Sequence, residues 1–84
     1  MTKGLELLIL HLCQERGPGK TICPSEVARA VETEEAAWRR LLPEIRRVAS
    51  DMARDQKIAI YRKGRVIDPD AIKGVIRLGL PLRD

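Results

Sequence analysis

Aromatic side chains are scarce in this sequence of 84 residues, which contains one Trp, one Tyr and no Phe. Hydrophobic residues of all kinds nevertheless make up 44% of the chain. The core therefore has to be built from Leu, Ile, Val and Ala. Surfaces that bind single-stranded nucleic acid by stacking successive bases need several exposed rings. The sequence gives little support to a stacking surface of that kind.

Cysteine and histidine are also few, because the chain has only Cys13, Cys23 and His11. Their spacing matches no zinc motif, and three ligands fall short of the four that a structural zinc site uses. One histidine leaves no Ser/His/Asp set, and no placed pair of carboxylates is visible. We therefore expect no catalytic residues, no metal and no cofactor, and we expect that the protein is not an enzyme.

A glycine needed for nucleotide binding is missing as well. The segment Gly19-Lys20-Thr21 is similar to the end of a phosphate-binding loop, but that loop has a further glycine where Gln14 stands. The loop also follows a strand, whereas this segment follows a predicted helix. We therefore interpret Gly19 as a turn residue.

Long hydrophobic runs are absent. The apolar run Leu7-Leu8-Ile9-Leu10 is bounded by Glu6 and His11. It is too short for a signal peptide, and no run approaches the roughly 18 residues of a membrane span. Two cysteines do not require an oxidising compartment. We expect a cytoplasmic protein with no membrane partner, and the chain length fits a single domain over 1–84.

Carboxylates are absent from one stretch of the basic second half. Residues 1–42 hold six Lys or Arg and six Glu. Residues 43–84 hold ten Lys or Arg and six Asp or Glu, which accounts for the net charge of +4. The segment 57–67 has four cationic residues and no carboxylate. A basic surface of this kind attracts polyanions such as nucleic acid.

Apolar spacing predicts four helices. Residues 3–16, 24–31 and 34–42 carry apolar side chains at helical intervals. Proline is tolerated in the first turn of a helix but disrupts its interior. We therefore expect Pro43 to begin a separate helix over 43–56.

The fourth helix has one apolar stripe and one polar side. Its inner stripe consists of Ile45, Val48, Ala49 and Met52. On a regular helix the side chains that then point away from the core, or flank that side, are Arg46, Arg47, Ser50 and Arg54.

A β-hairpin is expected after the helices, over 57–68, with Gly64 at its tip. The residues at 74–84 alternate as in a strand, and Gly79 and Pro81 favour an extended C-terminal arm or an edge strand. Helices followed by a basic hairpin are the order of a winged helix. The predicted fold is mainly α with a small β-hairpin (α+β), a winged helix-turn-helix; the hairpin argues against a plain helix-turn-helix.

Five segments resemble a known family. They are GPGKTICPSEVAR at 17–29, Trp38, LPEIRR at 42–47, KGRVIDP at 63–69 and KGVIRL at 73–78, with Val75 where proline is expected. The family consists of short bacterial domains of unknown function that are winged-helix-like. The resemblance implies that fold and a bacterial cytoplasmic setting, and it implies no activity.

The predicted function is that of a regulatory nucleic-acid-binding module, with duplex DNA as the first partner. In helix-turn-helix proteins the second helix of the motif lies in the major groove. On this hypothesis the helix contributes Arg46, Arg47, Ser50 and Arg54, and the hairpin contributes phosphate contacts from Arg62, Lys63 and Arg65.

Two alternatives remain open from the sequence. Arg47 stands three residues after Glu44 and four before Asp51, which is the spacing of ion pairs on a solvated helix. The same fold also suits a protein-interaction adaptor. The apolar side chains of Leu7, Leu10, Leu80 and Leu82 could form a homodimer contact for that adaptor or for a DNA-binding dimer, or they could cover one another within a monomer.

Overall fold

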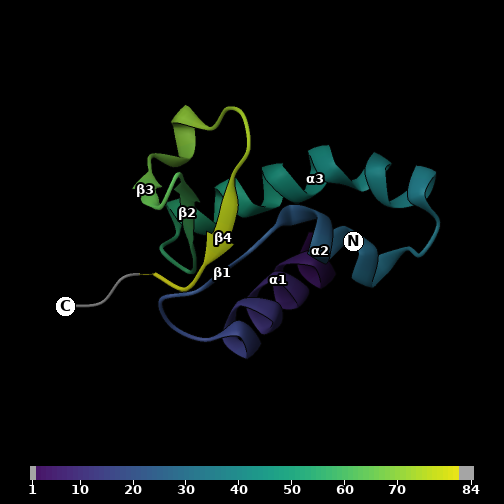
Figure 1. Ribbon diagram of the computed structural model, residues 1–84, viewed down its shortest axis with the longest axis horizontal. Helices are drawn as coiled ribbons and strands as arrows, with labels where there is room; N and C mark the ends of the chain where they lie inside the picture. The colour runs from purple at the N-terminus through teal and green to yellow at the C-terminus, as the bar shows by residue number, and fades with distance from the viewer. Residues whose placement is uncertain (1, 82–84) are drawn as a thin grey trace.

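Three α-helices and a four-stranded antiparallel sheet make up residues 2–81, the part of the chain that the computed structural model describes (Figure 1). In chain order the elements are α1 (Thr2–Arg16), β1 (Thr21–Ile22), α2 (Pro24–Val31), α3 (Glu35–Arg54), β2 (Ala59–Arg62), β3 (Arg65–Ile67), the 3₁₀ turn η1 (Pro69–Ala71) and β4 (Arg77–Gly79). The predicted α+β class is confirmed. The winged-helix assignment stays a prediction.

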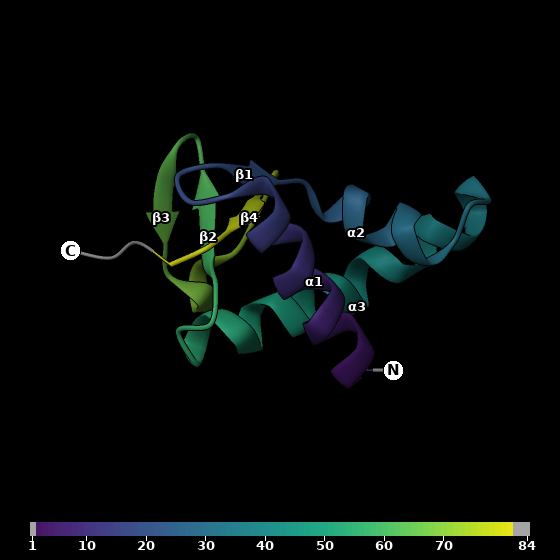
Figure 2. The ribbon, with the colours of Figure 1, turned by 90° about the horizontal axis from the view of Figure 1, so that it is seen from below.

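The sheet and the helices form two parts of one elongated molecule. The strand order is β1-β4-β2-β3, and every neighbouring pair is antiparallel. Figures 1 and 2 show α2 and the first half of α3 extending side by side away from the sheet. The principal dimensions are 39 × 25 × 21 Å. Across residues 2–81 the helices are all too short or too polar to cross a membrane.

An aliphatic core lies where α1, α3 and the inner face of the sheet meet. The largest fully buried side chains include Leu5, Ile9, Ile22, Ile45, Met52, Ile58, Ile60, Ile76 and Leu78. Burial of one such side chain stabilises the fold by about 1.5–3 kcal/mol. One face of the sheet is therefore fixed against the helices.

Pro43 does not begin a helix, and the two helices expected at 34–42 and 43–56 are one helix, α3. The apolar stripe of α3 continues from Trp38 and Leu41 through Ile45, so the whole helix packs along its length. Pro43 itself is exposed, on the side where a lost backbone hydrogen bond can be replaced by water. Packing of the stripe outweighs the local cost of the proline.

The structure also differs from the prediction of an extended C-terminal arm or edge strand at 74–84. Residues Arg77–Gly79 form β4, which is an inner strand paired with both β1 and β2. Gly79 permits this position because it has no side chain, and Pro81 comes after the strand has ended. Residues 82–84, Leu82 among them, lie outside the described residues.

Replacing Pro43 with alanine should stabilise the protein. The substitution restores a backbone N–H that can donate to the Arg39 carbonyl and removes the ring clash. We expect Pro43→Ala to raise the free energy of unfolding by about 1–3 kcal/mol, measured by urea denaturation.

The matched control is Pro18→Ala, in the exposed turn after α1. That substitution only increases the conformational entropy of the unfolded chain, so it should leave the free energy of unfolding unchanged or slightly lower. A Pro43→Ala protein no more stable than the parent would show that α3 does not continue through this position.

Candidate nucleic-acid interface

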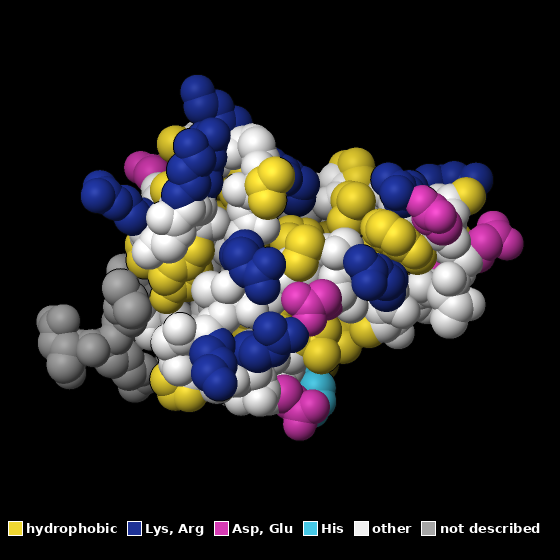
Figure 3. Space-filling view, in the orientation of Figure 1, with side chains coloured by type: hydrophobic (Ala, Val, Ile, Leu, Met, Phe, Trp, Pro, Cys, Tyr) yellow, Lys and Arg dark blue, Asp and Glu magenta, His cyan; other side chains and the backbone are white. Residues whose placement is uncertain are grey.

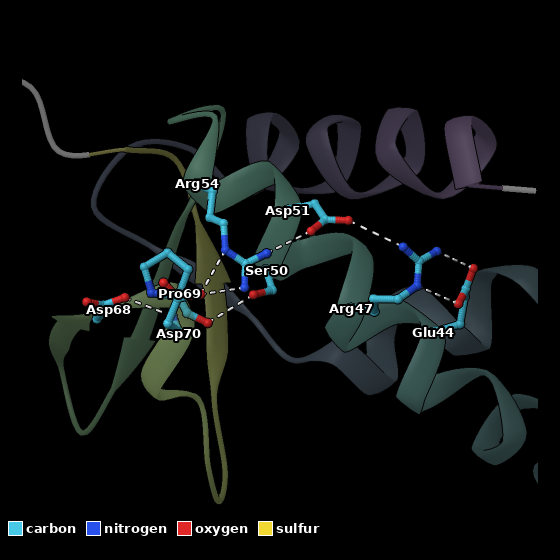
Figure 4. A network of polar contacts seen from close by, with 8 residues as sticks. All are labelled: Glu44, Arg47, Ser50, Asp51, Arg54, Asp68, Pro69 and Asp70. Atoms are coloured by element: carbon cyan, nitrogen blue, oxygen red, sulfur yellow. Dashed lines mark hydrogen bonds and ion pairs between the residues drawn. The ribbon is translucent and has the colours of Figure 1, made fainter.

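Two arginines on the solvent side of α3 are held in ion pairs (Figure 4). Arg47 lies between Glu44, at 2.7 Å, and Asp51, at 3.3 Å. Arg54 contacts Asp51 at 2.8 Å and donates from Nε to Asp70 at 2.9 Å. We call these five residues the α3 charge network. Both arginines, which were expected to meet nucleic acid, already have anionic partners.

Hydrogen bonding keeps the α3 charge network ionised. The Arg47 guanidinium holds the pKa of Glu44 below its ordinary value, and Glu44 in turn raises the pKa of Arg47. Asp70 raises the pKa of Arg54, chiefly through their hydrogen bonds. These side chains are exposed, so each ion pair contributes little to stability while still occupying an arginine.

The other two predicted residues of α3 tie the helix to the segment before β4. Ser50 is 9% exposed, and its hydroxyl donates to the Pro69 carbonyl at 2.9 Å. Arg46 donates to the Gly74 carbonyl at 3.1 Å. The structure therefore does not bring Arg46, Arg47, Ser50 and Arg54 together as one free surface.

The β2–β3 hairpin, by contrast, carries three cations at its tip: Arg62, Lys63 and Arg65. It turns at Lys63 and Gly64, whose φ values are 52° and 79°, as in a two-residue turn that follows the strand twist. Arg62 and Arg65 lie directly opposite each other beside the turn. Like charges in that position are destabilising. Within residues 2–81 none of these three cations forms an ion pair.

A groove of about 470 Å³ lies between the tip of this hairpin and the residues that lead into β1. We call it the hairpin groove, and its lining consists of Gly19, Thr21, Tyr61, Arg62, Lys63, Gly64, Val75 and Arg77. Three of these residues are cationic and none is a carboxylate. Lys and Arg side chains gather over the sheet end of the face drawn in Figure 3.

Arg77 is fixed in this groove by β1. Its Nε donates to Thr21 Oγ1 at 2.6 Å, and its Nη2 donates to the Thr21 carbonyl at 3.1 Å. A guanidinium has five N–H donors, so three remain free. Sequence reasoning missed Arg77 because the residues around it were assigned to an arm. Its only signal was the outward position in the alternation of 76–82.

Tyr61 is fixed as well. Its hydroxyl donates to the Leu80 carbonyl at 3.1 Å, and its ring lies against Gly79. A Cβ on Gly79 would stand 3.1 Å from Tyr61 Cε1 and 2.9 Å from the Lys20 carbonyl oxygen. The contact with the Lys20 backbone is too short for any Cβ, and the contact with the ring is tight, so a side chain at this position would force β4 or the ring to shift.

The cysteines offer no site. Cys13 is buried, and desolvation raises its pKa to about 11, so its thiol stays protonated. Cys23 precedes α2, where its N–H donates to the Glu26 carboxylate at 2.7 Å and its Sγ accepts a hydrogen bond from Ser25 at 3.1 Å. Among residues 2–81 no cluster of His, Cys, Asp and Glu could hold a metal ion.

The leucines predicted to form a homodimer contact differ in exposure. Leu7 is 61% exposed, whereas Leu10 and Leu80 are partly buried against the core. Leu82 lies outside the described residues. The apolar side of α1 is therefore largely covered by the protein itself.

The α3 charge network predicts a dependence of stability on pH. The pKa of Glu44 is lower in the folded protein than in the unfolded chain, so Glu44 contributes stability above its unfolded pKa. That contribution is lost as the pH falls through the lowered, folded pKa. We expect Glu44→Gln to reduce the loss of unfolding free energy between about pH 5 and pH 3. Urea denaturation at low salt measures it.

Glu32→Gln is the control, because Glu32 is exposed and forms no ion pair with another residue of 2–81. It makes the same change of charge outside the network. If the free energy of unfolding falls with pH equally in the parent and in both variants, the Glu44–Arg47 pair does not contribute to the acid sensitivity of the fold.

Comparison with known proteins assigns a family and no activity. The chain matches none of the curated proteins. A family model described as "Protein of unknown function (DUF3253)" matches residues 2–81. This agrees with the resemblance to a family of unknown function found in the sequence. Because the match covers nearly the whole chain, the protein belongs to the family of proteins of unknown function DUF3253.

Proposed function

We propose that this domain binds duplex nucleic acid, with DNA as the first candidate, through the tip of the β2–β3 hairpin. The observation that carries the proposal is the positive charge of Arg62, Lys63 and Arg65, which form no ion pair with any residue of 2–81. A phosphate between the two opposed arginines would relieve their repulsion. Neutralising phosphates also releases counterions, which favours binding at low salt.

The order of the elements supports a winged-helix role for this hairpin. A helix, a short strand, two further helices and a hairpin follow one another along the chain, as they do in winged helices. On this proposal the hairpin is the wing. Arg77 and Lys20, from the neighbouring strand and turn, extend the phosphate-binding surface across the sheet.

The proposed contribution of α3 is smaller than the sequence indicated. Arg47 and Arg54 would have to leave their carboxylates before meeting a phosphate or a base, whereas the hairpin cations have no carboxylate partner among the described residues 2–81. Phosphate contacts position a protein on nucleic acid, and base contacts select the sequence. We therefore propose a regulatory module that supplies affinity and little base selection of its own.

A protein-interaction adaptor has less support. The observations that favour it are four exposed apolar side chains within residues 2–81: Leu7 and Val31 on helices, and Val66 and Val75 in or beside the sheet. Scattered apolar side chains of this kind are ordinary on protein surfaces. A pair of opposed arginines that forms no ion pair within residues 2–81 is less common, so nucleic acid is the better candidate.

The test is fluorescence polarisation with labelled random duplex DNA over a range of salt concentrations. Four phosphate contacts predict a slope of log affinity against log salt near −3.6. Lys63→Glu/Arg65→Glu should weaken binding at least tenfold and reduce the slope by about 2. Both residues are exposed, so the variant should fold normally, which circular dichroism checks.

Lys3→Glu/Arg40→Glu makes the same change of net charge on exposed helical residues away from the sheet. It should weaken binding far less than the hairpin variant. Equal weakening by both variants would mean that net charge alone attracts the DNA. Absence of binding at low salt would contradict the proposal altogether.

A further inference from the structure

Phosphate binding does not account for the apolar part of the hairpin groove. Val75 is 81% exposed, the largest exposure among the bulky apolar residues described. It lines the groove together with the Tyr61 ring, which is only partly buried. Duplex phosphates would contact the three cations of the groove and would leave these two side chains in water.

We infer that the hairpin groove holds one unpaired nucleotide, with its phosphate at Arg77 and Lys63 and its base against Tyr61 and Val75. Within a duplex both faces of a base are covered by its neighbours. An apolar site can therefore receive a base only where the base is unpaired. If the nucleotide is part of a bound DNA strand, the inference rests on the proposed function. If it is a free nucleotide, the inference is independent of the proposed function.

The size and lining of the groove fit this ligand. Its volume of about 470 Å³ lies in the range of small-molecule sites. A base stacked on an aromatic side chain gains affinity whatever its identity. The cations supply the complement for the phosphate, and no carboxylate in the lining opposes it. One ring suffices for one nucleotide, whereas a row of bases would need more aromatic residues than this chain has.

The groove is also organised before any ligand arrives. Thr21 fixes the guanidinium of Arg77 through two hydrogen bonds, and three N–H donors of Arg77 remain for a phosphate. The Leu80 carbonyl fixes the Tyr61 hydroxyl, and Gly79 sets the depth of the ring. A ligand therefore has few side chains to order on binding, which favours affinity.

The experiment compares two labelled DNAs of equal nucleotide count, a blunt duplex and a duplex with a single-stranded overhang. Free adenosine monophosphate is titrated separately as a third probe. We expect the overhang duplex to bind at least fivefold more tightly than the blunt duplex. A single strand releases fewer counterions per phosphate contact than a duplex does, so phosphate contacts alone would make the overhang duplex bind less tightly. Tighter binding of the overhang duplex therefore reports the unpaired nucleotide.

Two pairs of variants test whether the preference for the overhang duplex arises in the hairpin groove. Tyr61→Leu should abolish the preference, whereas Tyr61→Phe, which keeps the ring, should retain it. Val75→Glu should also abolish the preference and cannot disturb the core, because Val75 is exposed. Leu7→Glu makes the same change of charge at an exposed apolar residue of α1 and should keep the preference.

The outcomes separate the groove from the proposed function. Equal affinity for both DNAs, together with no binding of adenosine monophosphate, overturns the inference and leaves duplex binding standing. Nucleotide binding that Val75→Glu removes, without an overhang preference, supports the groove as a site for a free nucleotide. If no DNA binds, the proposed function fails, and the nucleotide titration still decides the inference.

Discussion

At Gly79 the backbone before β1, the ring of Tyr61 and the backbone of β4 approach so closely that a side chain has no room. A Cβ there would meet the Lys20 carbonyl oxygen at 2.9 Å. The close approach lets β4 enter the sheet between β1 and β2. It thereby places Arg77 beside Thr21 and opposite Tyr61 in the register. The hairpin groove exists because these strands meet at a glycine.

The positions of the carboxylates divide the protein surface into a charge-balanced region along α3 and a basic region at the hairpin tip. Glu44, Asp51 and Asp70 lie along or beside α3 and pair with its arginines, whereas no carboxylate of residues 2–81 pairs with the cations of the hairpin tip. Exposed ion pairs add little to stability, but they lower the charge that α3 offers to a polyanion. A modest net charge of +4 can therefore still give one strongly basic region, at the end of the sheet.

Local signals in the sequence were sufficient for the elements that depend on local chemistry. Pro24 at a first helical position indicated α2, and Gly64 between β-forming residues indicated the hairpin. Pro43 led to a wrong prediction of two helices. The rule that proline disrupts a helix interior is local, and here the packing of the apolar stripe along the whole of α3 outweighs it. The position of β4 could not be predicted, since it depends on a contact between Gly79 and residues distant in the chain.

In the candidate site, too, the sequence allowed prediction of the residues that share a local segment, and not of those that long-range contacts bring together. Arg62, Lys63 and Arg65 stood out because they share one acid-free segment. Ser50 was expected on the outer side of a helix, but the segment around Pro69 covers it. Asp70 lies 16 residues from Arg54, so no helical spacing rule could pair the two. Arg77 joins the site only through the sheet.

The most direct test of the hairpin surface is a two-dimensional ¹⁵N–¹H NMR titration of the protein with duplex DNA. The largest shifts should fall on the backbone amides of Thr21, residues 61–65 and Arg77, while those of Arg47 and Arg54 change little. The opposite distribution, with the largest shifts along α3 and none at the hairpin, would contradict the assignment of the nucleic-acid surface.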